Sequence, residues 1–84
     1  RYGNLEIVEY LIEKGTDINK SNNYGNTPLY IASQYGNLEI VKFLIEKGAD
    51  INKSNNNGNT PLYIASQDGH LGIVEYLIEK GADI

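Results

Sequence analysis

Residues 27–48 read TPLYIASQYGNLEIVKFLIEKG, and residues 60–81 repeat them as TPLYIASQDGHLGIVEYLIEKG. A shift of the whole chain by 33 positions aligns residues 1–51 with residues 34–84, and only ten of the 51 aligned pairs differ. Self-similarity at a fixed period of this length is typical of repeat proteins, in which each period forms one structural unit. The sequence therefore predicts a stack of repeats rather than one globular core.

Each period contains the signals for two short helices. Thr27 is expected to cap the first helix through its hydroxyl, and Pro28 suits the first helical position because its missing N–H would have no partner there. Gly36 supplies the positive φ angle that ends this helix. The second helix is predicted to start at Asn37, with this residue as its cap, and to end at Gly48.

The second helix is predicted to be amphipathic. Its apolar residues recur at helical spacing, while charged residues take the opposite face. The apolar set is Leu38, Ile40, Val41, Leu44 and Ile45, and the charged set is Glu39, Lys42 and Glu46. After Gly48, the asparagine-rich run through Gly58 is predicted to form an extended turn.

These features resemble the ankyrin repeat family, whose pattern is a period of 33 residues with a turn, two helices and the motif T-P-L-H-x-A. Residues 27–32 and 60–65 each match five of the six motif positions. The departure is Tyr30 and Tyr63, where the family usually has the histidine that ties neighbouring turns together. The resemblance covers the whole chain and implies an all-α solenoid of stacked helix-turn-helix units with β-turn or hairpin loops.

The resemblance also implies a division into repeats, with a partial repeat at 1–21, a full repeat at 22–54 and a near-complete repeat at 55–84. About three such units are needed for stability, because one unit cannot bury its own apolar face. The helix expected at 5–14 lacks a first-helix partner, which leaves Leu5, Val8 and Leu11 short of cover. We expect both ends to be cuts within a longer array, and the 84-residue chain to be marginally stable or to self-associate through its uncapped ends.

The composition excludes several classes of function. The chain has 84 residues, no cysteine, one histidine and a net charge of −4, so it cannot form a thiolate zinc site, a cysteine nucleophile or a histidine metal cage. No apolar run approaches the roughly 18 residues that cross a membrane, and the lysines form no basic stripe for nucleic acid. We expect an intracellular, cytoplasmic protein without cofactor, metal, nucleic-acid partner or membrane insertion.

Two sets of candidate chemical residues favour structural interpretations. Asp17, Asp50 and Asp83 share one repeat phase, but stacked helices lie about 8–10 Å apart, too far for successive carboxylates to share a calcium ion. Each aspartate is expected to bond the backbone of its own turn instead. His70 has no serine or cysteine partner in a relay, so we interpret it as a helix-start residue rather than a catalytic base. No catalytic residue is expected, and the chain is predicted not to be an enzyme.

The remaining candidates belong to the concave surface that the family uses to bind partners. Several of these positions differ between the copies, as expected for residues that serve a partner rather than the scaffold. The resemblance places on this surface Tyr2, Asn23, Tyr24, Asn26, Gln34, Tyr35, Asn56, Asn57, Asn59, Gln67 and Asp68. Tyrosine gives a large contact area at low entropy cost, and amides supply adaptable hydrogen bonds. Alternatively, Tyr24 and Tyr35 merely cover neighbouring turns.

Two functional hypotheses follow. The resemblance implies a non-enzymatic module that holds a protein partner in the concave groove, with Tyr2, Tyr24 and Tyr35 as anchors. The alternative is a structural spacer that sets the distance between other domains, which the high identity between the copies would suit. Both hypotheses remain open because a fold does not fix a function. What distinguishes them is whether the concave residues matter for any association.

Overall fold

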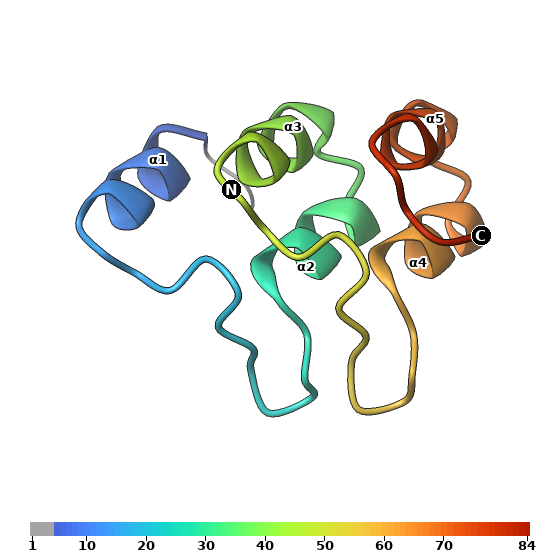
Figure 1. The fold of residues 1–84 in the computed structure, drawn as a ribbon, viewed down its shortest axis with the longest axis horizontal. Coiled ribbons are helices and arrows are strands. Elements are labelled where there is room, and N and C mark those ends of the chain that lie inside the picture. The colour runs from blue at the N-terminus through green and yellow to red at the C-terminus, as the bar shows by residue number, and fades with distance from the viewer. Residues whose placement is uncertain (1–4) are drawn as a thin grey trace.

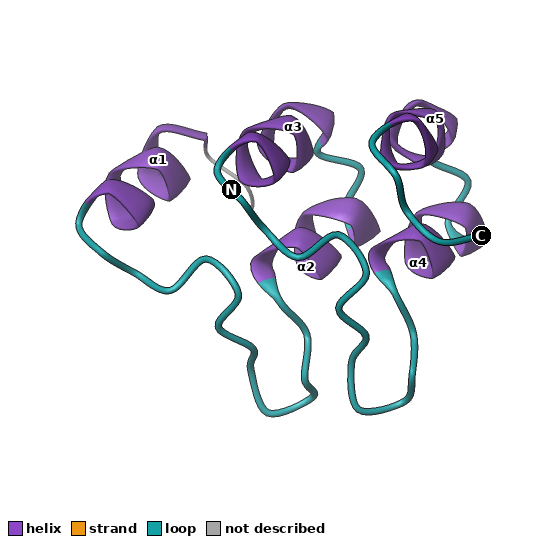
Figure 2. Ribbon diagram, in the orientation of Figure 1, coloured by secondary structure: helices purple, strands orange, loops and turns teal. Residues whose placement is uncertain are grey.

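The computed structural model describes residues 5–84, which form two layers of short helices (Figure 1). In chain order these helices are α1 (Leu5–Glu13), α2 (Pro28–Gln34), α3 (Leu38–Glu46), α4 (Pro61–Gln67) and α5 (Leu71–Glu79). One layer holds α1, α3 and α5, the other holds α2 and α4, and the long loops project beyond the second layer. Every regular element in residues 5–84 is a helix (Figure 2), which confirms the predicted all-α stack.

The first helix of each pair begins as predicted. The Thr27 side chain accepts a hydrogen bond from the backbone N–H of Tyr30 at 3.2 Å, and Pro28 takes the first helical position. Thr60 and Pro61 start α4 in the same way. A threonine hydroxyl here satisfies one of the backbone donors that a helix start leaves without a partner.

The second helix of each pair begins differently. Asn37 occupies the N-cap of α3, but its side chain makes no capping hydrogen bond, so the predicted cap is wrong. The reason lies in the backbone, because ψ is 80° at Asn37 and 167° at Thr27, and a capping side chain requires the extended conformation of Thr27. Gly36, at a φ of 76°, makes the tight turn between α2 and α3 that was predicted.

Helix α3 is amphipathic, as predicted. It buries Ile40, Val41 and Leu44, and the charged side chains predicted for its other face are exposed. Leu38 and Ile45 are only partly buried and pack at the edge of the core. Within the described residues the core lies between the two layers, and its buried members come from α2 to α5 and from Ala82 after α5.

Helix α1 is the exception among the five. It has no buried residue, and it packs mainly on α3. Leu5 and Val8 are partly buried and Leu11 is 46% exposed. This confirms the expectation that the first helix would lack cover. None of the helices within 5–84 has the length and the apolar character needed to cross a bilayer.

Candidate partner-binding surface

The structure separates the predicted partner-binding residues into two groups. The first group lies in the loops that project from the helices and contains Asn23, Tyr24, Asn26, Asn56, Asn57 and Asn59. The second group lies at the C-terminal ends of α2 and α4 and contains Gln34, Tyr35, Gln67 and Asp68. Tyr2 lies outside the described residues. The two groups are at opposite ends of the inner helices α2 and α4.

Each projecting loop is closed by an asparagine at its base. The Asn22 side-chain oxygen accepts hydrogen bonds from the backbone N–H groups of Tyr24 at 2.9 Å and Asn26 at 3.0 Å. The backbone N–H of Asn22 also donates to the carbonyl of Asn26 at 3.0 Å. Asn55 makes the corresponding bonds in the second loop. Asparagine favours turns because its side chain bonds the backbone two residues on, so the sequence itself fixes the shape of both loops.

The two loops are also bonded to each other. The Asn55 side-chain amide donates to the Asn26 side-chain oxygen at 2.9 Å. Asn56 donates from its backbone to the Tyr24 carbonyl and from its side chain to the Asn23 carbonyl, both at 3.0 Å. Thus the amides of Asn26 and Asn56, assigned to a partner by the sequence interpretation, are engaged within the chain. The spacing of the asparagines at 33 residues placed them in corresponding loops, but it did not show that the loops bond each other.

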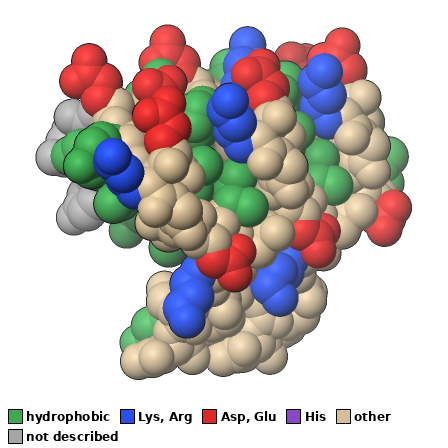
Figure 3. Space-filling model, turned by 60° about the vertical axis from the view of Figure 1, so that its left-hand side comes forward, with side chains coloured by type: hydrophobic (Ala, Val, Ile, Leu, Met, Phe, Trp, Pro, Cys, Tyr) green, Lys and Arg blue, Asp and Glu red, His purple; other side chains and the backbone are tan. Residues whose placement is uncertain are grey.

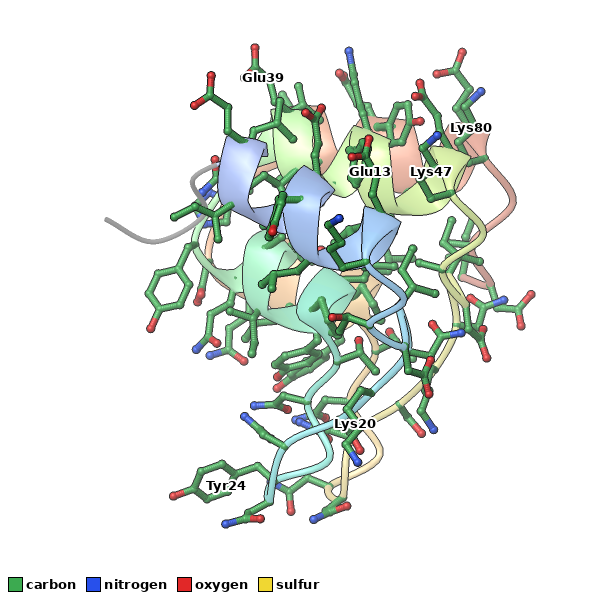
Figure 4. All side chains as sticks on the ribbon, turned by 90° about the vertical axis from the view of Figure 1, so that its left-hand side faces the viewer. Glu13, Lys20, Tyr24, Glu39, Lys47 and Lys80 are labelled. Atoms are coloured by element: carbon green, nitrogen blue, oxygen red, sulfur yellow. The ribbon has the colours of Figure 1, made fainter. Side chains whose placement is uncertain are left out.

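Tyr24 projects from the tip of the first loop (Figure 4). Its side chain is 72% exposed, so it does not serve as cover for a neighbouring turn. Its backbone N–H is held by Asn22 and its carbonyl by Asn56. A large exposed ring therefore stands on a backbone that is fixed on both sides. The projecting loops around it are largely uncharged, and most charged side chains gather over the helices (Figure 3).

The second group forms a row at the ends of the inner helices. Helices α2 and α4 pack side by side, so Gln34 and Gln67 take corresponding places in the row. Tyr35 and Asp68 follow as the C-cap residues. Tyr35 is 54% exposed, and Asp68 is exposed as well. The row therefore offers an aromatic ring, a carboxylate and amides that a partner could reach.

Tyr35 also borders a groove that the sequence interpretation did not foresee. The groove has a volume of about 240 Å³ and lies between α1 and the α2–α3 pair. Its lining consists of Val8, Pro28, Ile31, Ala32, Tyr35, Asn37, Ile40 and Leu44. The lining is almost wholly apolar. In the sequence, the missing first-helix partner of residues 5–14 was the signal for this groove.

His70 links the two complete helix pairs. It occupies the N-cap of α5, which confirms its predicted place at a helix start. Its Nε2 lies 3.0 Å from the carbonyl oxygen of Gln34, one of the last α2 carbonyls, which lack partners within their own helix. The ring also lies so close to Gly36 that a Cβ atom there would collide with it. Sequence reasoning missed the bond between His70 and Gln34 because these residues are 36 positions apart.

Two of the three repeated aspartates, Asp17 and Asp50, take the structural role expected of them. Asp17 accepts a hydrogen bond from the backbone N–H of Asn19 at 2.9 Å, and Asp50 does so from Asn52 at 3.1 Å. The side-chain oxygens of Asn19 and Asn52 then accept hydrogen bonds from the backbone N–H groups of Asp50 and Asp83, both at 2.9 Å. This second ladder joins successive repeats. In residues 5–84 no three acidic or histidine side chains are placed to hold a metal ion.

The outer helices present a different surface. Acidic and basic side chains both lie over the layer of α1, α3 and α5 (Figure 3). Lysines at the helix ends lie over aromatic rings of their own helices, with Lys14 5.5 Å from the Tyr10 ring centre and Lys80 5.6 Å from that of Tyr76. Such mixed, solvated charge is ordinary for a helix surface. The uncharged aromatic surface thus belongs to the loops and the inner helices.

Comparisons with known proteins agree with this architecture. The family model described as ankyrin repeats (3 copies) matches residues 1–84. A protein of Acanthamoeba polyphaga mimivirus that is named as an ankyrin repeat protein is 58% identical to this chain over 33 residues. That match covers 39% of this chain and 25% of the viral protein, so the shared segment is a small part of the relative.

Proposed function

Because this chain belongs to the ankyrin repeat family, we propose that it is a non-enzymatic module that binds a protein partner. Ankyrin repeats are generally protein–protein interaction modules. The proposed binding surface comprises the projecting loops, with Tyr24 at their tip, and the row at the C-terminal ends of α2 and α4. In the family this is the concave side of the stack.

The observation that carries the proposal is the state of Tyr24. A ring that is 72% exposed has little to contribute to folding, whereas aromatic anchors dominate protein interfaces. The hydrogen bonds of Asn22 and Asn56 hold the backbone beneath the ring. Binding therefore would not have to order this loop, and a preorganised surface saves that part of the entropy cost.

The remaining residues of the surface are given distinct roles. Asn57 is exposed in the second loop, at the position that Tyr24 holds in the first. Gln67 and Asp68 are exposed at the end of α4 and would form polar contacts at the rim. Asn26, Asn56 and Asn59 lie in the hydrogen-bonded loop framework and would act by holding the surface in shape.

The test is affinity capture from lysate of the source cells with the intact protein and two variants. The variant Tyr24→Ala with Tyr35→Ala removes both exposed rings from the proposed surface. Tyr10→Ala is the matched control, because Tyr10 is also an exposed tyrosine but lies on the outer helix α1. Circular dichroism must first show equal helicity. The proposal expects a protein that wild type and the control enrich and that the double variant loses.

The spacer hypothesis predicts the opposite result. The loop ladder and the aspartate–asparagine ladder join successive repeats without any partner, as a spacer would require. If the double variant captures the same proteins as wild type, the concave surface is not the binding site and the spacer role is favoured. A loss shared by the Tyr10→Ala control would mean that capture does not depend specifically on the proposed surface, and it would contradict the proposal.

A further inference from the structure

Asn57 and Gly58 form a chemically reactive pair at the tip of the second projecting loop. The chain has eleven asparagines, and Asn57 is the only one that glycine follows. Asparagine is a thermolabile residue, because the backbone nitrogen of the next residue can attack its side-chain amide. Glycine favours this attack, since a residue without a Cβ atom allows the backbone to approach other atoms closely.

The fold requires the glycine of this pair. Gly58 has a φ of 81°, and its counterpart Gly25 in the first loop has a φ of 79°. A residue with a side chain is strained at such an angle. The preceding residue is not restricted in this way, since the first loop has Tyr24 where the second loop has Asn57. The reactive pair therefore occurs in only one of the two loops.

The side chain at this loop position is open to water. Asn57 is exposed. Its counterpart Tyr24 is 72% exposed, although the second loop lies beside the first (Figure 1) and is bonded to it through Asn56. The exposure is thus a property of the loop tip, because it persists where a neighbouring loop is present. Water, which is the reactant in the conversion of an amide to an acid, has access to this site.

The attacking nitrogen is held by the turn at residues 55–58. The backbone N–H of Gly58 donates to the carbonyl of Asn55 at 2.9 Å. The Asn55 side-chain oxygen accepts hydrogen bonds from the backbone N–H groups of Asn57 at 2.9 Å and Asn59 at 3.0 Å. While the turn is closed, the N–H proton of Gly58 is protected from removal by base. Attack therefore requires a local opening of the kind that hydrogen exchange detects.

From these observations we propose that Asn57 is a site of spontaneous deamidation, controlled by the opening of the turn at residues 55–58. In the open turn, hydroxide removes the N–H proton of Gly58, and the nitrogen attacks Cγ of Asn57. The side-chain nitrogen takes a proton from water and leaves as ammonia, so that a succinimide ring remains. Water then adds to one of the two ring carbonyls and opens the ring to aspartate or isoaspartate. In total, an amide and water become a carboxylic acid and ammonia, without oxidation or reduction.

Both products change the projecting loops. Each places a negative charge at Asn57, because a carboxyl group is ionised at neutral pH, in a region that is largely uncharged. Isoaspartate also routes the main chain through the former side chain, which lengthens it before Gly58 and disrupts the bond to Asn55. Asn56 belongs to the same turn and donates to the carbonyl of Tyr24. The modification of the second loop therefore weakens the support of the first.

The test is incubation of the intact 84-residue chain at neutral pH, followed by peptide mass spectrometry. A synthetic peptide of residues 52–61 is the reference for the open turn. Asn57 is expected to convert before any other asparagine, and at least about tenfold more slowly in the chain than in the peptide. Hydrogen exchange and deamidation both begin with the loss of the same Gly58 proton. The protection factor of this amide is therefore expected to equal the ratio of the two deamidation rates.

Three variants test the control by the turn. Asn55→Ala removes the side-chain bonds to Asn57 and Asn59 but keeps the reactive pair, and it is expected to convert about tenfold faster than wild type. Asn19→Ala is the matched control, because it removes an asparagine side-chain bond to Asp50 outside the projecting loops, and it is expected to convert at the wild-type rate. Asn57→Gln is expected to remain unchanged, because its longer side chain would require a larger ring. If circular dichroism shows that Asn55→Ala is unfolded, the comparison of exchange with deamidation in wild type decides.

Several results would overturn the proposal. Conversion of another asparagine before Asn57 would contradict the site, as would an intact Asn57 after the peptide has converted and the Gly58 amide has exchanged. Equal rates in chain and peptide, a protection factor that differs from the rate ratio, or a folded Asn55→Ala that converts at the wild-type rate would contradict the control by the turn. The proposal does not rest on partner binding, because no partner takes part in these measurements.

Discussion

Helices α2 and α4 have the same seven residues, but only the alanine is buried in both. α2 buries Leu29, Tyr30, Ala32 and Ser33, whereas α4 buries Pro61, Ile64 and Ala65. α2 is covered on the side where α4 packs, and α4 is covered on the side where α2 packs. In a linear stack each unit contacts only its neighbours, so burial here is a property of position in the stack and not of the local sequence.

The largest effect on stability is expected at a repeat position where one leucine is buried and its counterpart is exposed. Leu44 of α3 is fully buried and Leu11 of α1 is 46% exposed. Leu44→Ala should lower the free energy of unfolding by roughly 2–5 kcal/mol, because it leaves a cavity in the core. Leu11→Ala should cost less than about 1 kcal/mol, because half of that side chain already contacts water. Urea unfolding followed by circular dichroism measures both, and equal losses would contradict the comparison.

The two projecting loops offer the next contrast. Gly25 and Gly58 have nearly the same positive φ, 79° and 81°. A Cβ atom at Gly25 would collide with Asn56, whereas one at Gly58 would meet open space. Both changes to alanine should destabilise by about 1 kcal/mol through the backbone, and Gly25→Ala should cost about 1–2 kcal/mol more through the lost loop contact. Similar unfolding midpoints for the two variants would show that the loops do not support each other.

A smaller effect of opposite sign is expected at the repeated serine. The Ser33 hydroxyl is buried without a hydrogen-bond partner, and Ser66 is exposed. Ser33→Ala should raise the free energy of unfolding by about 1 kcal/mol, because it removes an unsatisfied buried polar group. Ser66→Ala should stay within about 0.5 kcal/mol of wild type. A destabilising Ser33→Ala would indicate a hydrogen bond that this account lacks.

The sequence predicted what each repeat does by itself. Thr27 and Pro28 begin α2, and Gly36 ends it, because these signals act within a few residues. Asp17 and Asp50 bond their own turns for the same reason. Periodicity also indicated that α1 would lack cover, since a missing partner can be recognised from the repeat phase.

The contacts between repeats could not be predicted in the same way. The bond of His70 to Gln34 and that of Asn55 to Asn26 join residues about one period apart. Their geometry depends on how successive units are rotated and shifted, which a local pattern does not contain. For this reason two residues of the candidate surface were assigned wrongly. Asn26 and Asn56 were expected to contact a partner, but their side chains bond the other projecting loop of the chain.

The most direct test of the central claim is the pair Tyr30→Ala and Tyr63→Ala. The two tyrosines stand at the same position of identical helices, and their exposed fractions are 5% and 49%. Urea unfolding of dilute, monomeric protein should show a loss of about 3 kcal/mol for Tyr30→Ala and of about 1 kcal/mol or less for Tyr63→Ala. Equal losses would contradict the claim that cover by the neighbouring repeat, and not the sequence of the helix, decides what each residue contributes.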